Sequence, residues 1–222
     1  MTRQTPAALA AAAVALLLAA CAGGPPPPDW QFNARAAMDH AVAATLAGDT
    51  RAETLEFARA RSEITKTGRV ELLARAELMH CAARVASLVL ESCEGFEQLR
   101  PDATAEQRAY ADYLGARLQA KDVGLLPPQQ RAAAAADAGA ALGSLQGIDD
   151  PLSRLVAAAV LFQAGRASPA VLGLAVDTAS AQGWRRPLLA WLNVQALRAE
   201  KAGESAEAQR LRRRIDLVQD AR

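Results

Sequence analysis

The chain has 222 residues, and with 25 basic against 24 acidic side chains its formal net charge is +1. A chain so close to neutrality gives no electrostatic case for nucleic-acid binding. It also lacks any run of alternating β-branched residues, whereas helix start and stop signals recur along its length. The composition therefore argues against a sheet-based protein and predicts an all-α one.

Residues 1–20 have the three-part pattern of a secretory signal. Arg3 is the only charge before residue 29, and an unbroken run of Ala, Leu and Val extends from Ala7 to Ala20. A span of the bilayer core needs about 20 apolar residues, and this run is shorter. A positive start, a short apolar run and small residues at its end predict a cleaved signal rather than a transmembrane helix.

The apolar run closes with Leu18-Ala19-Ala20-Cys21, which resembles the lipobox of bacterial lipoproteins. The resemblance implies cleavage before Cys21, a diacylglycerol on its sulfur, and an acyl chain such as palmitate on the new amine. Two or three acyl chains form a stable membrane anchor. Ala22, not Asp, follows the cysteine, which in this family implies the inner leaflet of the outer membrane, facing the periplasm. An ordinary signal in front of a chance cysteine is the alternative.

Residues 21–30 are expected to tether the domain that follows, residues 31–222. Two glycines follow Ala22, and four prolines occupy Pro25 to Pro28. A polyproline stretch extends by about 3.1 Å per residue, so these four form a stiff spacer of roughly 12 Å. A disordered N-terminus without a spacer role is the alternative.

Cys81 and Cys93 are the two cysteines that remain once Cys21 is acylated. In an oxidising compartment they predict a disulfide. Twelve residues of straight helix would hold them about 18 Å apart, but a disulfide needs Cα atoms within about 7 Å. The chain must therefore turn back between them. Two free thiols or a metal pair are the alternatives, although His80 beside Cys81 lacks zinc-ligand spacing, and we expect no metal and no cofactor.

Capping and stop signals predict about nine helices with short connections. Thr50 to Glu53 and Thr104 to Gln107 both fit the capping-box pattern. The expected helices cover 31–47, 50–67, 71–88, 104–118, 128–145, a segment opening at Pro151, 169–182, 187–202 and a last one from Ser205. Their narrow, Ala-rich apolar stripes favour antiparallel hairpins stacked as an α-solenoid.

The helix pairs at 34–67 and 189–222 resemble degenerate tetratricopeptide repeats, in which small residues lie where two helices meet. Glu53 stands where that family has Ala, and Arg212 replaces an aromatic residue. The resemblance implies a tetratricopeptide-like solenoid, and generic helical hairpins are the alternative. The matching positions are Ala41, Phe57, Ala60, Ala196 and Ala208.

Few side chains are candidates for chemistry. The only histidines are His40 and His80, and no Gly-x-Ser-x-Gly elbow occurs, so we predict no catalytic residues and no enzyme. Trp184, Arg185 and Arg186 form a candidate interface, because an exposed Trp flanked by Arg is typical of binding hot spots, although a packing role is the alternative. The basic cluster at 210–214 is interpreted as a solvated helix face rather than a lipid contact.

These observations predict a lipid-anchored, non-catalytic protein-interaction or scaffold module of the cell envelope, with an envelope protein as its partner. The alternatives are a helical small-ligand or lipid-binding lipoprotein, or an enzyme or enzyme regulator acting on the cell wall. A deep apolar pocket would favour a ligand, and a shallow concave face with exposed aromatic residues would favour a scaffold.

Overall fold

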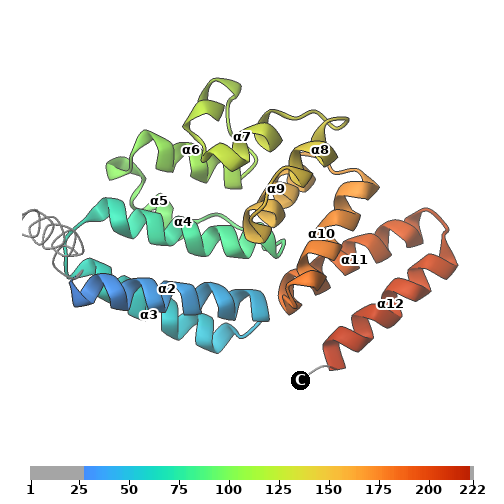
Figure 1. Ribbon diagram of the computed structural model, residues 1–222, viewed down its shortest axis with the longest axis horizontal. Helices are drawn as coiled ribbons and strands as arrows, with labels where there is room; N and C mark the ends of the chain where they lie inside the picture. Colours follow the sequence, from blue (N-terminus) through green and yellow to red (C-terminus); the bar gives the residue numbers. More distant parts are fainter. Residues whose placement is uncertain (1–27, 221–222) are drawn as a thin grey trace, which may run out of the picture.

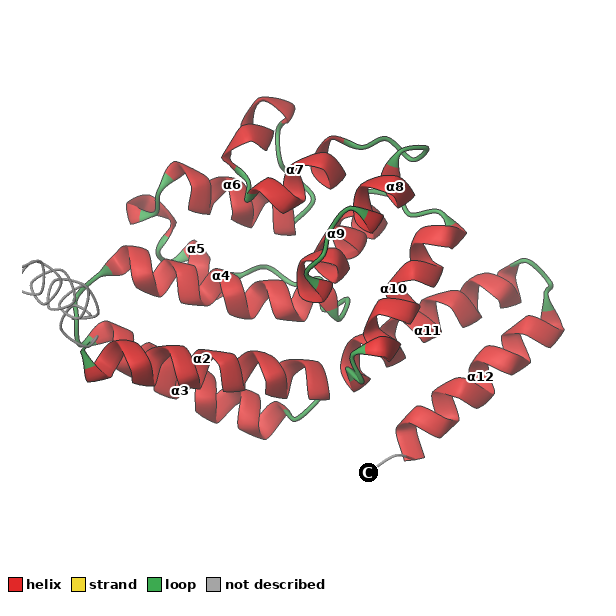
Figure 2. Ribbon diagram, viewed as in Figure 1, coloured by secondary structure: helices red, strands yellow, loops and turns green. Residues whose placement is uncertain are grey.

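The structure, a computed structural model, describes residues 28–220 and is all-α there, with eleven α-helices, two 3₁₀ helices and no strand. The predicted fold class is confirmed, and Figure 2 shows helices joined by loops throughout this range. The predicted signal, the lipid site at Cys21 and most of the tether lie outside the described residues. Asp29 and Trp30, assigned above to the tether, form the first residues of a helix.

Three helices form the N-terminal part of the molecule. α2 (Asp29–Ala47) and α3 (Thr50–Thr65) make a tight antiparallel hairpin, and α4 (Val70–Ala86) packs against both of them (Figure 1). Gly48 ends α2 with a φ of +86°, a left-handed conformation that glycine adopts at little cost. Small residues close the hairpin, since Ala41 and Ala60 are completely buried.

Four helices form the C-terminal part, each packed on the one before it: α9 (Pro151–Gln163), α10 (Pro169–Ala181), α11 (Arg185–Lys201) and α12 (Ser205–Asp220). α9 also packs directly on α4, so the two parts of the chain meet there (Figure 1). Trp191 of α11 is fully buried at this junction, and its indole N–H donates to the carbonyl of Ala86 at 3.1 Å.

Short helices lie between these two parts. They cover α4 and α9 on the side away from α3 (Figure 1). Their bounds are α5 (Glu94–Glu97), the 3₁₀ helix η1 (Arg100–Asp102), α6 (Ala105–Leu114), the 3₁₀ helix η2 (Ala120–Leu125), α7 (Pro128–Ala135) and α8 (Ala141–Gln146).

Several predicted helix starts are confirmed by their cap hydrogen bonds. Thr104 and Gln107 form the expected capping box. Asp150 accepts a hydrogen bond from the backbone N–H of Ser153, and Ser168 accepts one from that of Val171. A side-chain oxygen at these positions satisfies a backbone donor that the helix itself leaves unpaired.

The disulfide between Cys81 and Cys93 is present, with the two Cα atoms 5.7 Å apart. It joins α4 to the residue that precedes α5. The chain turns back after α4 at Leu88, which has a φ of +57°. The separation of Cys81 and Cys93 required the chain to reverse its direction between them, and this reversal lies directly beyond the end of α4.

Three helix predictions are wrong. α3 is capped by Asp49, which accepts from the N–H of Ala52, and not by a capping box at Thr50. α6 ends at Leu114, so it does not reach residue 118. The Ala-rich helix expected over 128–145 is broken between α7 and α8, where Ala136 takes an extended ψ of 138°.

The break after α7 has a tertiary cause. The guanidinium of Arg166, which follows α9, donates to the carbonyl of Ala134 at 3.3 Å and also to that of Ala136. Asp137 then accepts from the N–H of Ala140 at 2.8 Å, which closes a local turn. These contacts satisfy backbone groups outside a helix, and the weakly amphipathic Ala run offers little packing to oppose them.

Within residues 28–220, no helix combines the length and apolar character that crossing a bilayer demands.

Candidate functional site

An apolar cavity of about 870 Å³ opens on the surface of the described part of the chain. α2 and α4 form two of its walls, α6 and α9 close the far side, and Trp184 lies at one end. Its lining includes Val42, Leu46, Met79, Tyr110, Val156 and Trp184. A volume of this size falls within the range of ordinary binding sites, about 300–1,000 Å³.

A second cavity of about 650 Å³ continues the first along the same two helices. Asp39, Arg75 and Met79 line both cavities, so the two adjoin, and together they are called the α2–α4 groove. The groove follows α2 from Trp30 to Leu46, which is about 24 Å of helix at about 1.5 Å per residue.

Large apolar side chains stand open to solvent in the groove. Phe32 is 73% exposed and Met79 is 40% exposed, although most apolar side chains of their size in this protein are buried. Methionine adapts its shape to different surfaces and is common where proteins bind apolar partners. Burial, with a contribution from the charge of Asp150, raises the pKa of Tyr110, so its phenol stays protonated and able to donate a hydrogen bond.

The charged side chains of the groove differ in their surroundings. Asp39 lies 3.9 Å from Arg35 one turn earlier on α2. Glu106, in the first turn of α6, has a lowered pKa because of hydrogen bonds with its own backbone and with Thr104. Arg75 is exposed and makes no ion pair or side-chain hydrogen bond with any residue of the range 28–220.

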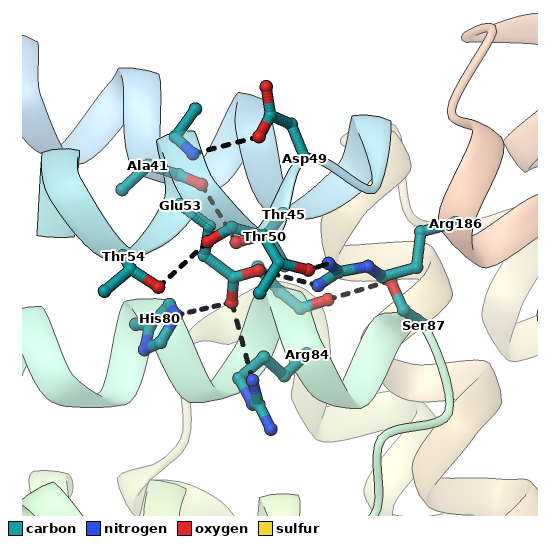
Figure 3. Close-up of polar contacts among 12 residues, drawn as sticks. Ala41, Thr45, Asp49, Thr50, Glu53, Thr54, His80, Arg84, Ser87 and Arg186 are labelled. Carbon is teal, nitrogen blue, oxygen red and sulfur yellow. Dashed lines mark hydrogen bonds and ion pairs between the residues drawn. The ribbon is translucent and has the colours of Figure 1, made fainter. Parts of the chain in front are cut away.

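A cluster of charged residues centred on Glu53 lies between the α2–α3 hairpin and α4 (Figure 3). The Glu53 side chain is 4% exposed. Its Oε1 accepts from Nε2 of His80 at 2.8 Å and lies 3.5 Å from Nη1 of Arg84. Its Oε2 accepts from Nη1 of Arg186 at 2.7 Å. The cluster therefore joins three helices, α3, α4 and α11.

The pKa values of this cluster follow from burial and hydrogen bonding. Burial acts to raise the pKa of Glu53, but hydrogen bonds from His80 and Arg186 outweigh it, so the pKa lies below its ordinary 4.5. Burial lowers the pKa of His80 from its ordinary 6.5, and the hydrogen bond to Glu53 offsets this only in part. Glu53 is thus charged and His80 neutral at neutral pH, with two arginines balancing the carboxylate.

The arrangement around Glu53 is suited to holding helices in place. Both carboxylate oxygens accept hydrogen bonds, and the ring of His80 stacks on Phe57 of α3 with centroids 4.1 Å apart. Because α2 is fixed to α3, the cluster sets where α2 stands relative to α4.

The candidate interface residues Trp184, Arg185 and Arg186 do not form one exposed patch. Trp184 is half-buried and lines the groove. Arg185 donates to the carbonyls of Val218 and Gln219 at 3.2 Å each, at the end of α12. Arg186 belongs to the Glu53 cluster. Of the three residues, Trp184 alone lines the groove. Arg185 instead binds the end of α12, and Arg186 binds α3 through Glu53.

Arg210 and Arg212 of the basic cluster on α12 have acidic partners. Arg210 pairs with Glu207 at 2.6 Å, and Arg212 pairs with Glu200 of α11 at 2.8 Å. Both arginines thus pair with acidic side chains of α11 or α12 on the exposed face of this helix pair, as the solvated-face interpretation expects. Residues 28–220 contain no group of three or more His, Cys, Asp or Glu side chains that could hold a metal ion.

Sequence reasoning missed the α2–α4 groove and the role of Glu53. One signal for Glu53 was present, since an acidic residue stood where a tetratricopeptide-like hairpin has a small one. No comparable signal marked the groove, because Val42, Met79 and Tyr110 each fit an ordinary core-facing stripe.

No protein-family model matches the sequence, and no match was found among curated proteins or solved structures. The fold and the groove define a class nonetheless: an all-α protein of stacked helices, arranged as in helical-repeat proteins, with an open apolar channel between two of them.

Proposed function

We propose that this protein is a non-catalytic binding module, held to the cell envelope by a lipid on Cys21, which binds an apolar helix of a partner protein in the α2–α4 groove. The observation that carries the proposal is the groove itself. It is long, lined mainly by apolar side chains and open to solvent, and it runs along α2 and α4, the second of which is tied to α3 and α11 by the Glu53 cluster.

A helix is the occupant that fits the groove best. A segment of about 16 residues would match its length of about 24 Å. Small residues on the walls, such as Ala43 and Ala82, allow another helix axis to approach closely. Helices that bind in grooves insert apolar anchors spaced by three or four residues, and Phe32, Met79 and Trp184 offer contacts at both ends and the middle.

A bound fatty-acid chain is the second candidate, and the apolar lining favours it. The position of its headgroup favours it less. A fatty acid that fills the groove carries its carboxylate at one end of the chain, whereas Arg75 lies near the middle of the groove, where the two cavities adjoin. A protein helix can place a charged side chain at any point along its length and therefore suits this groove better.

Peptide display tests the binding function. A library of 20-residue peptides would be selected against the mature chain carrying Cys21→Ser, which stays soluble without its lipid. We expect selected peptides to share apolar residues at helical spacing, and Met79→Asp to weaken their binding about tenfold or more. Leu55→Asp is the matched control, since Leu55 is a 61% exposed apolar residue on α3 outside both cavities.

Two results would contradict the groove as a peptide site. One is equal binding by the Met79→Asp and Leu55→Asp variants. The other is the absence of selected peptides together with saturable binding of labelled palmitate that Met79→Asp abolishes, which would establish the lipid-binding alternative.

The anchor is tested separately, by feeding cells labelled palmitate and comparing the wild type with Cys21→Ser. We expect label in the wild-type protein alone. Label of equal intensity in both proteins would refute lipidation at Cys21.

A further inference from the structure

We infer that Arg75 selects the partner of the groove: the bound helix carries an acidic side chain near its middle, which pairs with this guanidinium. The inference rests on the proposed peptide-binding function and makes it more specific, since it names the chemistry of the segment as an acidic amphipathic helix.

The position of Arg75 is the first reason. Arg75 lies on α4 and lines both cavities, at the point where they join. Its neighbours one turn away on the groove side are apolar, Leu72 and Met79. A ligand that fills the groove therefore passes over the guanidinium and removes water from it, and a charge that loses water without gaining a partner weakens binding.

The second reason is that none of the acidic residues nearby pairs with Arg75. Glu71 lies one turn before Arg75 on α4, but its carboxylate pairs with Arg69 at 2.6 Å. Asp39 lies across the groove beside Arg35, and Glu106 is held by the first turn of α6. Among residues 28–220, Arg75 has no ion-pair partner within 4.0 Å, so its charge is left for a ligand.

The source of the matching carboxylate follows from the same geometry. The groove continues on both sides of Arg75, toward Trp30 in one direction and toward Trp184 in the other. A helix that fills it places a middle residue over Arg75 and its own ends elsewhere. The carboxylate must then come from an Asp or Glu side chain and not from a chain terminus. Arginine can hold such a group with two parallel hydrogen bonds.

The experiment repeats the peptide selection on the mature Cys21→Ser chain and on the same chain carrying Arg75→Glu. The peptides are fused to the phage coat through their C-termini, so only side chains supply carboxylates. Arg51→Glu is the matched control, because Arg51 is an exposed arginine on α3 outside both cavities. Circular dichroism spectra and unfolding midpoints confirm that each variant is folded before it is used.

We expect the peptides selected by the parent chain to share an Asp or Glu flanked by apolar residues at helical spacing. Arg75→Glu should weaken their binding about tenfold, the effect of losing one charge-assisted hydrogen-bonded pair, and Arg51→Glu should leave it unchanged. Selection on the Arg75→Glu chain should return Lys or Arg at the same position. Replacing the shared acid in the peptide with Gln should weaken binding to the parent chain but not to Arg75→Glu.

The outcomes separate this inference from the proposed function. Peptides that depend on Met79 but share no acidic position, and bind Arg75→Glu as well as the parent, would overturn the role of Arg75 and leave the groove as a peptide site. A failure to select any peptide that depends on Met79 would overturn both.

Discussion

Nη1 of Arg186 donates a hydrogen bond to Oε2 of Glu53 at 2.7 Å, although 133 residues separate them in the sequence. Nη2 of the same guanidinium donates to Oγ1 of Thr50 at 2.9 Å. One side chain at the start of α11 thus holds the start of α3. The N-terminal hairpin, which forms one wall of the groove, is fastened to the C-terminal half of the molecule by this contact (Figure 3).

Arg186→Met should therefore lower the free energy of unfolding by about 2 kcal/mol, because it removes charge-assisted hydrogen bonds from a buried carboxylate. Urea unfolding followed by circular dichroism measures this change. Arg51→Met serves as the control and should change stability by less than about 0.5 kcal/mol, as expected for an exposed position. A loss of similar size in both variants would show that the Glu53 contact is not the source of the effect.

The stability of the protein should fall as the pH is lowered through two windows. His80 resists protonation in the folded state, because its buried ring has a pKa below 6.5. The unfolded chain therefore takes up this proton first, and stability is lost from about pH 6.5 downward until the folded pKa is reached. Glu53, whose folded pKa lies below 4.5, contributes a second loss as the pH falls below that value.

His80→Gln should remove the first of these losses and keep the second, since Gln can still donate to Glu53 but does not titrate. Unfolding midpoints measured from pH 7.5 to 3.5 test this. His40→Gln, at a side chain that is 69% exposed, is the matched control for loss of an imidazole. If the His80→Gln profile runs parallel to the wild-type profile between pH 7 and 5, the assignment to His80 is wrong.

The disulfide should contribute about 3 kcal/mol, the chain-entropy value for a loop closed by cysteines 12 residues apart. Replacing both cysteines, as Cys81→Ser with Cys93→Ser, is expected to reduce the free energy of unfolding by that amount. Adding reductant to the wild type should reproduce the loss and leave the double variant unaffected. Labelling with a thiol reagent under denaturing conditions reports the bond directly, because the bonded cysteines react only after reduction.

The features that the sequence predicts correctly are those decided by neighbours in the chain. Thr104, Asp150 and Ser168 cap their helices through backbone groups three residues away, so a short pattern contains all the information needed. The disulfide was likewise within reach, because the predicted export and the predicted acylation of Cys21 left one pair of cysteines, and their spacing required one turn of the chain.

The features that the sequence does not predict depend on distant partners. The Thr50 to Glu53 pattern is identical to a capping box, yet Glu53 bonds to residues 27 and 133 positions away. The helix break after α7 depends on Arg166, 30 positions beyond Ala136. The groove is harder still to predict. It is the space that α2, α4, α6 and α9 leave unfilled when they pack, and no sequence pattern within a single helix indicates such a space.

Gln130 is another residue whose role appears only in the folded molecule. It is 1% exposed, its Oε1 accepts from the hydroxyl of Tyr113 at 2.7 Å, and its Nε2 donates to the carbonyl of Ser153 at 3.0 Å. The side chain therefore links α6, α7 and α9 on the far side of the groove. Burial raises the pKa of Tyr113, so its hydroxyl remains a donor that requires a partner.

Gln130→Met keeps the side-chain volume but leaves the buried Tyr113 hydroxyl without a partner and removes the hydrogen bond to the Ser153 carbonyl, and should reduce stability by about 3 kcal/mol. Tyr113→Phe added to this variant removes the stranded hydroxyl, so the double variant should be more stable than the sum of the two single losses predicts. A double-mutant cycle of urea unfolding measures that difference, which we expect to be about 1 kcal/mol. Strict additivity would mean that the phenol finds another partner once Gln130 is gone.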